Sequence, residues 1–284
     1  MITRRELITR TAIGITTASQ LASNLGATPL GLPIGCQLYP VRNSVAKDFE
    51  GTLKELAAAG FRTIELCSPH GYEKQGFGVL LTMKPSEIRQ KILAAGLTCD
   101  SSHYSLRELK ENLPERIAYA KELGLKQMIL ASASLRKDAT LADWSRVAGE
   151  LNKIGEHTLK AGIQAGFHNH DVEFNTIDGA LVYDKLMNEF DPKLVKMQFQ
   201  TVVARLGFDA PTIFEKYPGG RFISLHLQDW SPAEKKMVPI GKGQIDWTRL
   251  FSAAKKAGVK NYYVEMGLDE MKESVPYLNG LKTS

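Results

Sequence analysis

The sequence lacks several features that would point to a particular class of protein. No run of 18 apolar residues occurs in the 284-residue chain, so it predicts no membrane-spanning helix. The cysteines Cys36, Cys67 and Cys99 form no CxxC pair and no zinc-ribbon spacing, which makes them typical of small core residues. The net charge is only +5 and no dense Lys/Arg block occurs, so the sequence predicts no nucleic-acid partner.

The composition is that of an ordinary globular protein, with 43% hydrophobic and 24% charged residues. This excludes a disordered, collagen-like or coiled-coil chain. The length is sufficient for one α/β barrel, which takes about 250 residues. Nothing in the composition fixes the assembly state, so a homo-oligomer stays open.

The first 27 residues have the pattern of a twin-arginine export signal. Arg4 and Arg5 precede a weakly apolar stretch over 11–25 that ends near Ala27. We therefore predict a signal over 1–27, a barrel domain over 28–284 and a periplasmic location. The alternative is an amphipathic helix that stays on a cytoplasmic protein.

From Leu32 onward, short apolar runs alternate with helical patterns about every 30 residues. Glycines follow five of the helical patterns, where a helix end favours a left-handed residue. The runs predict strands over 33–39, 63–67, 97–102, 127–130, 163–168, 195–200, 222–227 and 262–265. Eight strands alternating with helices predict a single (β/α)8 TIM barrel; an open doubly wound sheet would normally have a glycine-rich phosphate turn after its first strand.

Polar residues gather at the carboxyl ends of these strands, where such a barrel builds its active site. In chain order they are Gln37, Glu65, His103, His168 with His170, Gln200, His226 and Glu265. Strand alternation places His168 and His170 on one face, and two buried imidazoles side by side favour a metal or an anion as partner. Imidazole and carboxylate ligands suit Mn, Zn, Co or Fe(II).

Single histidines also have simpler explanations. His70 is expected to anchor a loop by hydrogen bonding, and His157, on a helix, is expected to be solvated. His103 is as consistent with a loop anchor as with a substrate contact.

The segment from about 34 to 281 resembles the xylose-isomerase-like TIM-barrel family of sugar isomerases and epimerases. The matching motifs are GFHNHDVEF (166–174), DPKLV (191–195), YPGGRF (217–222), HLQD (226–229) and GKGQIDW (241–247). The resemblance implies one divalent metal held by the residues that end strands five to eight. Those positions are occupied here by His168, Gln200, His226 and Glu265.

Two of these positions depart from the family's commoner pattern. His168 replaces a carboxylate that also serves the epimerases as an acid/base, and Gln200 replaces an aspartate. With one carboxylate left, a divalent ion would keep a charge of about +1, which weakens metal binding but polarises a bound carbonyl more strongly. The base would then be Glu265, a metal-bound hydroxide, His103 or His170.

The resemblance implies proton abstraction next to the carbonyl of a small keto-sugar, leading to isomerisation or epimerisation. Elimination from a 3-keto-glycoside by a lyase is the alternative, and a non-catalytic sugar-binding barrel is another. A related DNA-repair endonuclease would need more carboxylate and histidine ligands and a basic groove. Besides Gln37 and Glu65, we expect Trp230 to stack on a sugar, although packing would explain it equally, and Lys242 to reach the pocket from a glycine loop.

Overall fold

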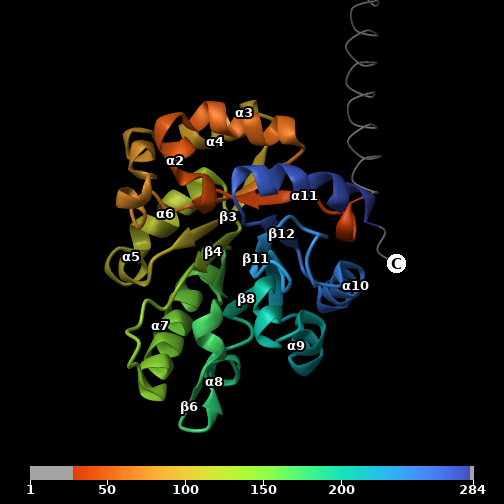
Figure 1. The fold of residues 1–284 in the computed structure, drawn as a ribbon. Helices are drawn as coiled ribbons and strands as arrows, with labels where there is room; N and C mark the ends of the chain where they lie inside the picture. Colours follow the sequence, from red (N-terminus) through yellow and green to blue (C-terminus); the bar gives the residue numbers. More distant parts are fainter. Residues whose placement is uncertain (1–27, 282–284) are drawn as a thin grey trace, which may run out of the picture.

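The computed structural model describes residues 28–281, which form a closed eight-stranded parallel barrel surrounded by helices (Figure 1). The strand order is β1-β12-β9-β8-β5-β4-β3-β2, so chain neighbours pair and β1 closes on β12. This confirms the predicted TIM barrel. The predicted export signal lies outside the described residues.

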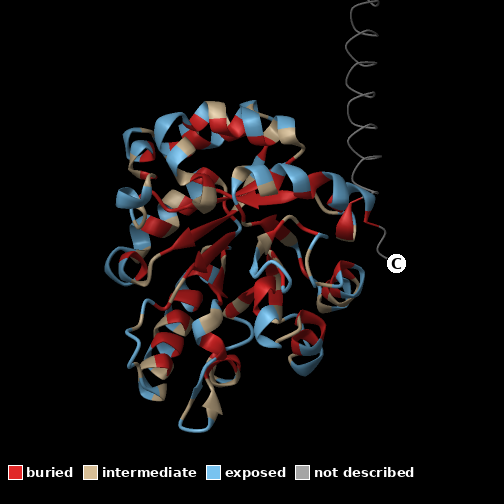
Figure 2. Cartoon of the chain, viewed as in Figure 1, coloured by how far each residue is buried: buried red, intermediate tan, exposed pale blue. Residues whose placement is uncertain are grey.

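The barrel strands agree closely with the predicted runs. They are β1 Gly35–Gln37, β2 Thr63–Cys67, β3 Thr98–Tyr104, β4 Gln127–Leu130, β5 Gln164–His168, β8 Val195–Gln200, β9 Phe222–Leu227 and β12 Asn261–Val264. Parallel strands covered on both faces read as near-continuous apolar runs, and these strands are the buried centre of the molecule (Figure 2).

Helices cover the outside of the barrel. They are α2 Arg42–Lys47, α3 Phe49–Ala59, α4 Pro85–Ala94, α5 Leu106–Glu111, α6 Leu113–Leu123, α7 Leu141–Lys160, α8 Val182–Glu189, α9 Ala210–Lys216, α10 Trp247–Ala257 and α11 Leu268–Gly280. In α10 the Asp246 side chain accepts from the Arg249 N–H at 3.0 Å, an N-cap worth about 1 kcal/mol. Gly258 ends this helix at φ 78°, where any other residue would be strained. His157 is exposed on α7, as expected.

The seam between β1 and β12 depends on Gly35. A Cβ at this position would lie 2.5 Å from the Tyr262 carbonyl oxygen and 2.5 Å from Cδ1 of Tyr263. Glycine therefore allows the two strands to approach closely enough to close the barrel.

Two short hairpins extend from strand ends. The first pairs β6 (Thr176–Ile177) with β7 (Ala180–Leu181), and the second pairs β10 (Asp229–Ser231) with β11 (Lys236–Val238). No helix within the described residues is long and apolar enough to cross a bilayer.

The buried carboxylate of Asp229 anchors the second hairpin and the loop after it. It accepts from the backbone N–H groups of Trp230, Gly241, Gly243 and Ile245 and from the Trp247 indole, at 2.9–3.3 Å. A Cβ at Gly243 would lie 2.1 Å from an Asp229 oxygen, so only glycine fits there. One anion therefore fixes the path of the chain from β9 to α10.

Candidate active site

Three histidines from different strands meet inside the barrel near the carboxyl ends of the strands. His103 lies in β3, His168 ends β5 and His226 lies in β9; all three are at most 4% exposed. Their ring centroids are 4.4 to 5.1 Å apart, and one ligand atom from each lies within 4.8 Å of the others. The barrel thus brings together residues separated by more than 120 positions in sequence.

Glu65 of β2 lies beneath this group and is fully buried. Its Oε1 accepts from the Ser101 hydroxyl at 2.6 Å and from the Gln198 amide at 2.7 Å. Its Oε2 accepts from the Gln37 amide at 2.7 Å and lies 2.5 Å from Nε2 of His226. Both oxygens are therefore occupied, and the partnership with Nε2 leaves Nδ1 of His226 to face elsewhere.

Glu265 follows β12 on the other side of His226. Its Oε2 accepts from the Gln200 amide at 2.6 Å and from the Gln228 amide at 3.2 Å, and it lies 3.1 Å from Nδ1 of His226. Its side chain is 15% exposed, in contrast to fully buried Glu65. The four residues predicted as one ligand set, His168, Gln200, His226 and Glu265, are thus brought together.

Several ligand-type atoms at this point have no hydrogen-bond partner among the described residues. They are both ring nitrogens of His168, Oε1 of Gln200 and Nδ1 of His226, and all are buried. Leaving a buried polar atom unpaired costs about 1–3 kcal/mol, so a cluster of such atoms points to a missing partner. Nitrogen and oxygen lone pairs beside one carboxylate are a donor set that fits a divalent cation.

The charges in the interior are strongly coupled. Burial lowers the pKa of His226, but Glu265 and Glu65 outweigh it and raise this pKa to about 10. Burial raises the pKa of Glu65, yet His103 and His226 bring it down to about 2. Burial and the neighbouring histidines hold the pKa of His168 well below its ordinary value, so its lone pairs are available near neutral pH.

A cavity of about 760 Å³ opens above this group. Gln200 and Glu265 reach it from the interior, and His170, exposed after β5, lines its wall. The pKa of His170 is lowered, chiefly by burial of its ring. Tyr39, Arg42, Arg205, Gln228 and Met237 also line the cavity, which has the size of a small-molecule site.

The predicted substrate-contacting residues lie in other places. Gln37 and Glu65 are fully buried beneath the histidines and do not line the cavity. Trp230 lies in β10 with the Arg205 guanidinium 5.5 Å from its ring centre. Lys242 does not reach the cavity as expected: its side chain is 61% exposed and pairs with Glu273 at 2.5 Å, because Asp229 turns the glycine loop outward.

Sequence reasoning missed Gln198, Ser101 and Gln228. Gln198 donates to Glu65 and accepts from Nε2 of His103 at 2.7 Å, so it links two members of the interior network. The strand alternation that places Gln200 inside also places Gln198 there, so this signal was present in the sequence. Ser101 and Gln228 are single polar residues on buried strand ends, and no pattern marked them.

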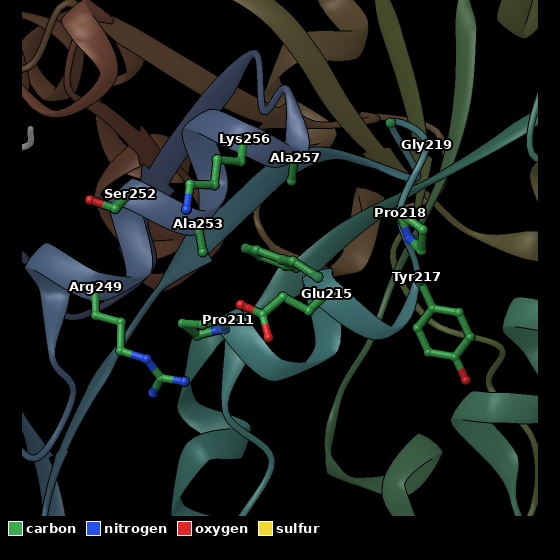
Figure 3. Close-up of a pocket in the computed structure, with 12 residues that line it drawn as sticks. Pro211, Glu215, Tyr217, Pro218, Gly219, Arg249, Ser252, Ala253, Lys256 and Ala257 are labelled. Carbon is green, nitrogen blue, oxygen red and sulfur yellow. The ribbon is translucent and has the colours of Figure 1, made fainter.

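A second cavity, of about 310 Å³, lies outside the barrel between α9 and α10 (Figure 3). Pro211, Phe214 and Ala253 give it a largely apolar wall, and the loop 217–220 that precedes β9 closes one side. This loop leads into β9, so it lies at the end of the barrel opposite the histidines. No histidine lines it, and the candidate active site is therefore the cavity above the strand ends.

Comparisons with known proteins agree with this architecture. The profile of the family described as xylose isomerase-like TIM barrel matches residues 53–279, and the chain belongs to this family. The family includes sugar isomerases and epimerases.

Among solved structures, the chain is similar to a sugar phosphate isomerase/epimerase from Parabacteroides distasonis. The two share 27% identity with a TM-score of 0.72, over 87% of this chain and 94% of that one. A D-psicose 3-epimerase from Clostridium cellulolyticum shares the fold, with a TM-score of 0.65 and 13% identity over 89% of this chain and all of that one. An inosose dehydratase from Lacticaseibacillus casei is 22% identical over 262 residues, 82% of this chain and 87% of that protein.

Proposed function

We propose that this protein is a divalent-metal-dependent enzyme that removes the proton next to the carbonyl of a keto-sugar, and so isomerises or epimerises it. The observation that carries the proposal is the unpaired state of buried His168, whose ring lies 4.4 Å from that of His226. Gln200 and Glu265 complete the set at the floor of the cavity.

His168, Gln200, His226 and Glu265 would hold the cation, and Mn, Co, Zn and Fe(II) all suit these donors. When bound, the cation supplies Lewis-acid polarisation of a substrate carbonyl, which makes the neighbouring C–H more acidic. Glu65 fixes His226 through Nε2, so that Nδ1 presents its lone pair to the ligand set. Gln200 and Gln228 fix the Glu265 carboxylate.

Three residues are candidates for the base: Glu265, His103 and His170. Nε2 of His103 is bonded to Gln198, and Glu265 already has three partners. His170 lines the cavity, and its lowered pKa keeps the imidazole neutral and able to accept a proton near pH 7. We therefore assign proton abstraction to His170.

Elimination is the second candidate reaction, with an inosose or a 3-keto-glycoside as substrate. Both routes begin with loss of the same proton, and the similarity to an inosose dehydratase favours elimination. The carboxylate that the resemblance implies at strand five is replaced by His168. A reaction that returns a proton to the opposite face of the sugar therefore lacks that acid, whereas elimination does not require it.

Incubation of the manganese- or cobalt-loaded protein with ketoses, 3-keto-glucosides and an inosose in deuterated water tests the proposal. We expect deuterium at the carbon next to the carbonyl, and the product then distinguishes isomerase or epimerase from lyase. His168→Ala should lower metal content and exchange by at least ~10-fold, whereas His157→Ala, on the exposed face of α7, should leave both unchanged. A metal-free protein with no exchange after metal addition would instead indicate a sugar-binding barrel.

A further inference from the structure

Arg42, at the start of α2, lines the active-site cavity with most of its hydrogen-bonding capacity unused. Its Nη1 donates to the Tyr39 carbonyl oxygen at 3.0 Å, and its guanidinium carbon lies 4.6 Å from the centre of the Tyr39 ring. These contacts hold the half-buried side chain in place. A guanidinium carries five N–H donors, so this arrangement leaves several available.

A comparison with the second arginine of the cavity shows that this is unusual. Arg205 pairs with Asp171 and packs over the Trp230 ring. No carboxylate among residues 28–281 lies within ion-pair distance of Arg42. Glu270 lines the same cavity without pairing with it, and Glu265 is engaged by Gln200 and Gln228. Arg42 is thus a fixed cation in a concave site without a partner from the described chain.

The barrel topology places Arg42 beside the reacting end of the site. β1, which leads to Arg42, pairs with β12, which leads to Glu265, with Cys36 opposite Val264. A sugar held at Glu265 would therefore have one end directed toward the β1 side of the cavity. His170 and Arg205 line the cavity together with them, and they come from the β5 and β8 side.

We propose that Arg42 is a specificity residue that binds an anionic substituent of the substrate, a carboxylate or a phosphate, on the sugar that Glu265 and its neighbours hold. This inference rests on the proposed function for the position of the sugar. An arginine fork matches both anions, and charge-assisted hydrogen bonds in a partly desolvated cavity are stronger than neutral ones. A neutral sugar would leave these donors to water.

The test is equilibrium binding, which needs no turnover. The full-length protein with manganese is titrated with D-glucose, D-glucuronate and D-glucose 6-phosphate by calorimetry. We expect at least one anionic sugar to bind roughly ten- to a hundredfold more tightly than glucose. In Arg42→Gln this advantage should disappear while glucose affinity stays the same.

Two further variants keep the test independent of folding. Arg42→Lys keeps the charge but loses the fork, so phosphate binding should fall less than carboxylate binding. Arg62→Gln is the matched control, because Arg62 also donates to backbone carbonyls, those of Ala57 and Phe61, but lies exposed outside the cavity. It should leave all three affinities unchanged.

Each outcome decides the matter. An anionic advantage that survives Arg42→Gln would show that the metal or another cation binds the anion, and would overturn the proposal. Equal binding of all three sugars, or no binding of either anionic sugar, would overturn it as well. Absence of deuterium exchange together with an Arg42-dependent advantage would refute the proposed function and leave anion recognition by Arg42 intact.

Discussion

The two halves of the barrel both end in polar side chains, but these side chains do different things. In the first half, Glu65 is fully buried and bonded to Ser101, Gln198 and Gln37. In the second half, His168 has both ring nitrogens unpaired, and Glu265 reaches the cavity. The first half therefore supports and orients, and the second half presents atoms to a ligand. A polar residue at a strand end can belong to either group, and only its partners distinguish them.

Removing the carboxylate of the presenting half should have the largest effect. Glu265→Gln takes away the single negative charge of the ligand set, so we expect kcat/KM to fall by roughly 10³-fold, with loss of bound metal. Steady-state kinetics and elemental analysis measure both. Glu270→Gln, a carboxylate of the same cavity outside the ligand set, is the control and should stay within about threefold. Similar losses in the two variants would contradict the assignment.

Glu65→Gln tests the supporting half. It leaves His226 without its buried partner, so the free energy of unfolding should fall by about 3–5 kcal/mol and metal affinity by roughly 10- to 100-fold. Because the folded pKa of Glu65, about 2, lies below the ordinary 4.5, its stabilisation is present above pH 4.5 and is lost as pH falls toward 2. Denaturant titrations at several pH values measure this loss, which the variant should lack. Unchanged stability would show that Glu65 supports nothing.

Glu173 sharpens the comparison, because it is as buried as Glu65 but has fewer partners. Its Oε2 accepts from the His170 N–H at 2.7 Å and its Oε1 has no partner among the described residues, so burial raises its pKa to about 7. A raised pKa stabilises the fold below pH 4.5 and loses that contribution as pH rises through 7. The free energy of unfolding should therefore decline by roughly 3 kcal/mol between pH 4.5 and 7. In Glu173→Gln this decline should vanish; an identical pH profile would refute the assignment.

The smallest effect is expected at Lys242. Its exposed ion pair with Glu273 contributes at most about 1 kcal/mol, and it does not line the cavity. Lys242→Gln should change kcat/KM by less than about twofold. A large rise in KM would mean that the glycine loop moves toward the cavity when substrate binds.

The sequence was sufficient to predict the barrel and the meeting of distant residues, because both follow from periodicity and topology. Strands β8 and β9 begin and end where the apolar runs do. β1 is shorter than predicted and β3 extends to Tyr104, so His103 lies inside a strand rather than after it.

The roles of individual strand-end residues could not be predicted in the same way. Glu65 and Glu265 look alike in sequence, and their different exposure depends on how deep each residue lies in the barrel. The position of Lys242 depends on Asp229, a tertiary contact that no local pattern contains.

The anchoring of the second hairpin by Asp229 has a practical consequence. Met237 of this hairpin lines the cavity, whereas its tip, residues 232–235, is exposed. Because the hydrogen bonds that fix the connection are made at its base, the tip can change in length and composition without disturbing the metal ligands. A directed-evolution library confined to residues 232–235 would therefore reshape the cavity entrance while leaving the catalytic floor untouched.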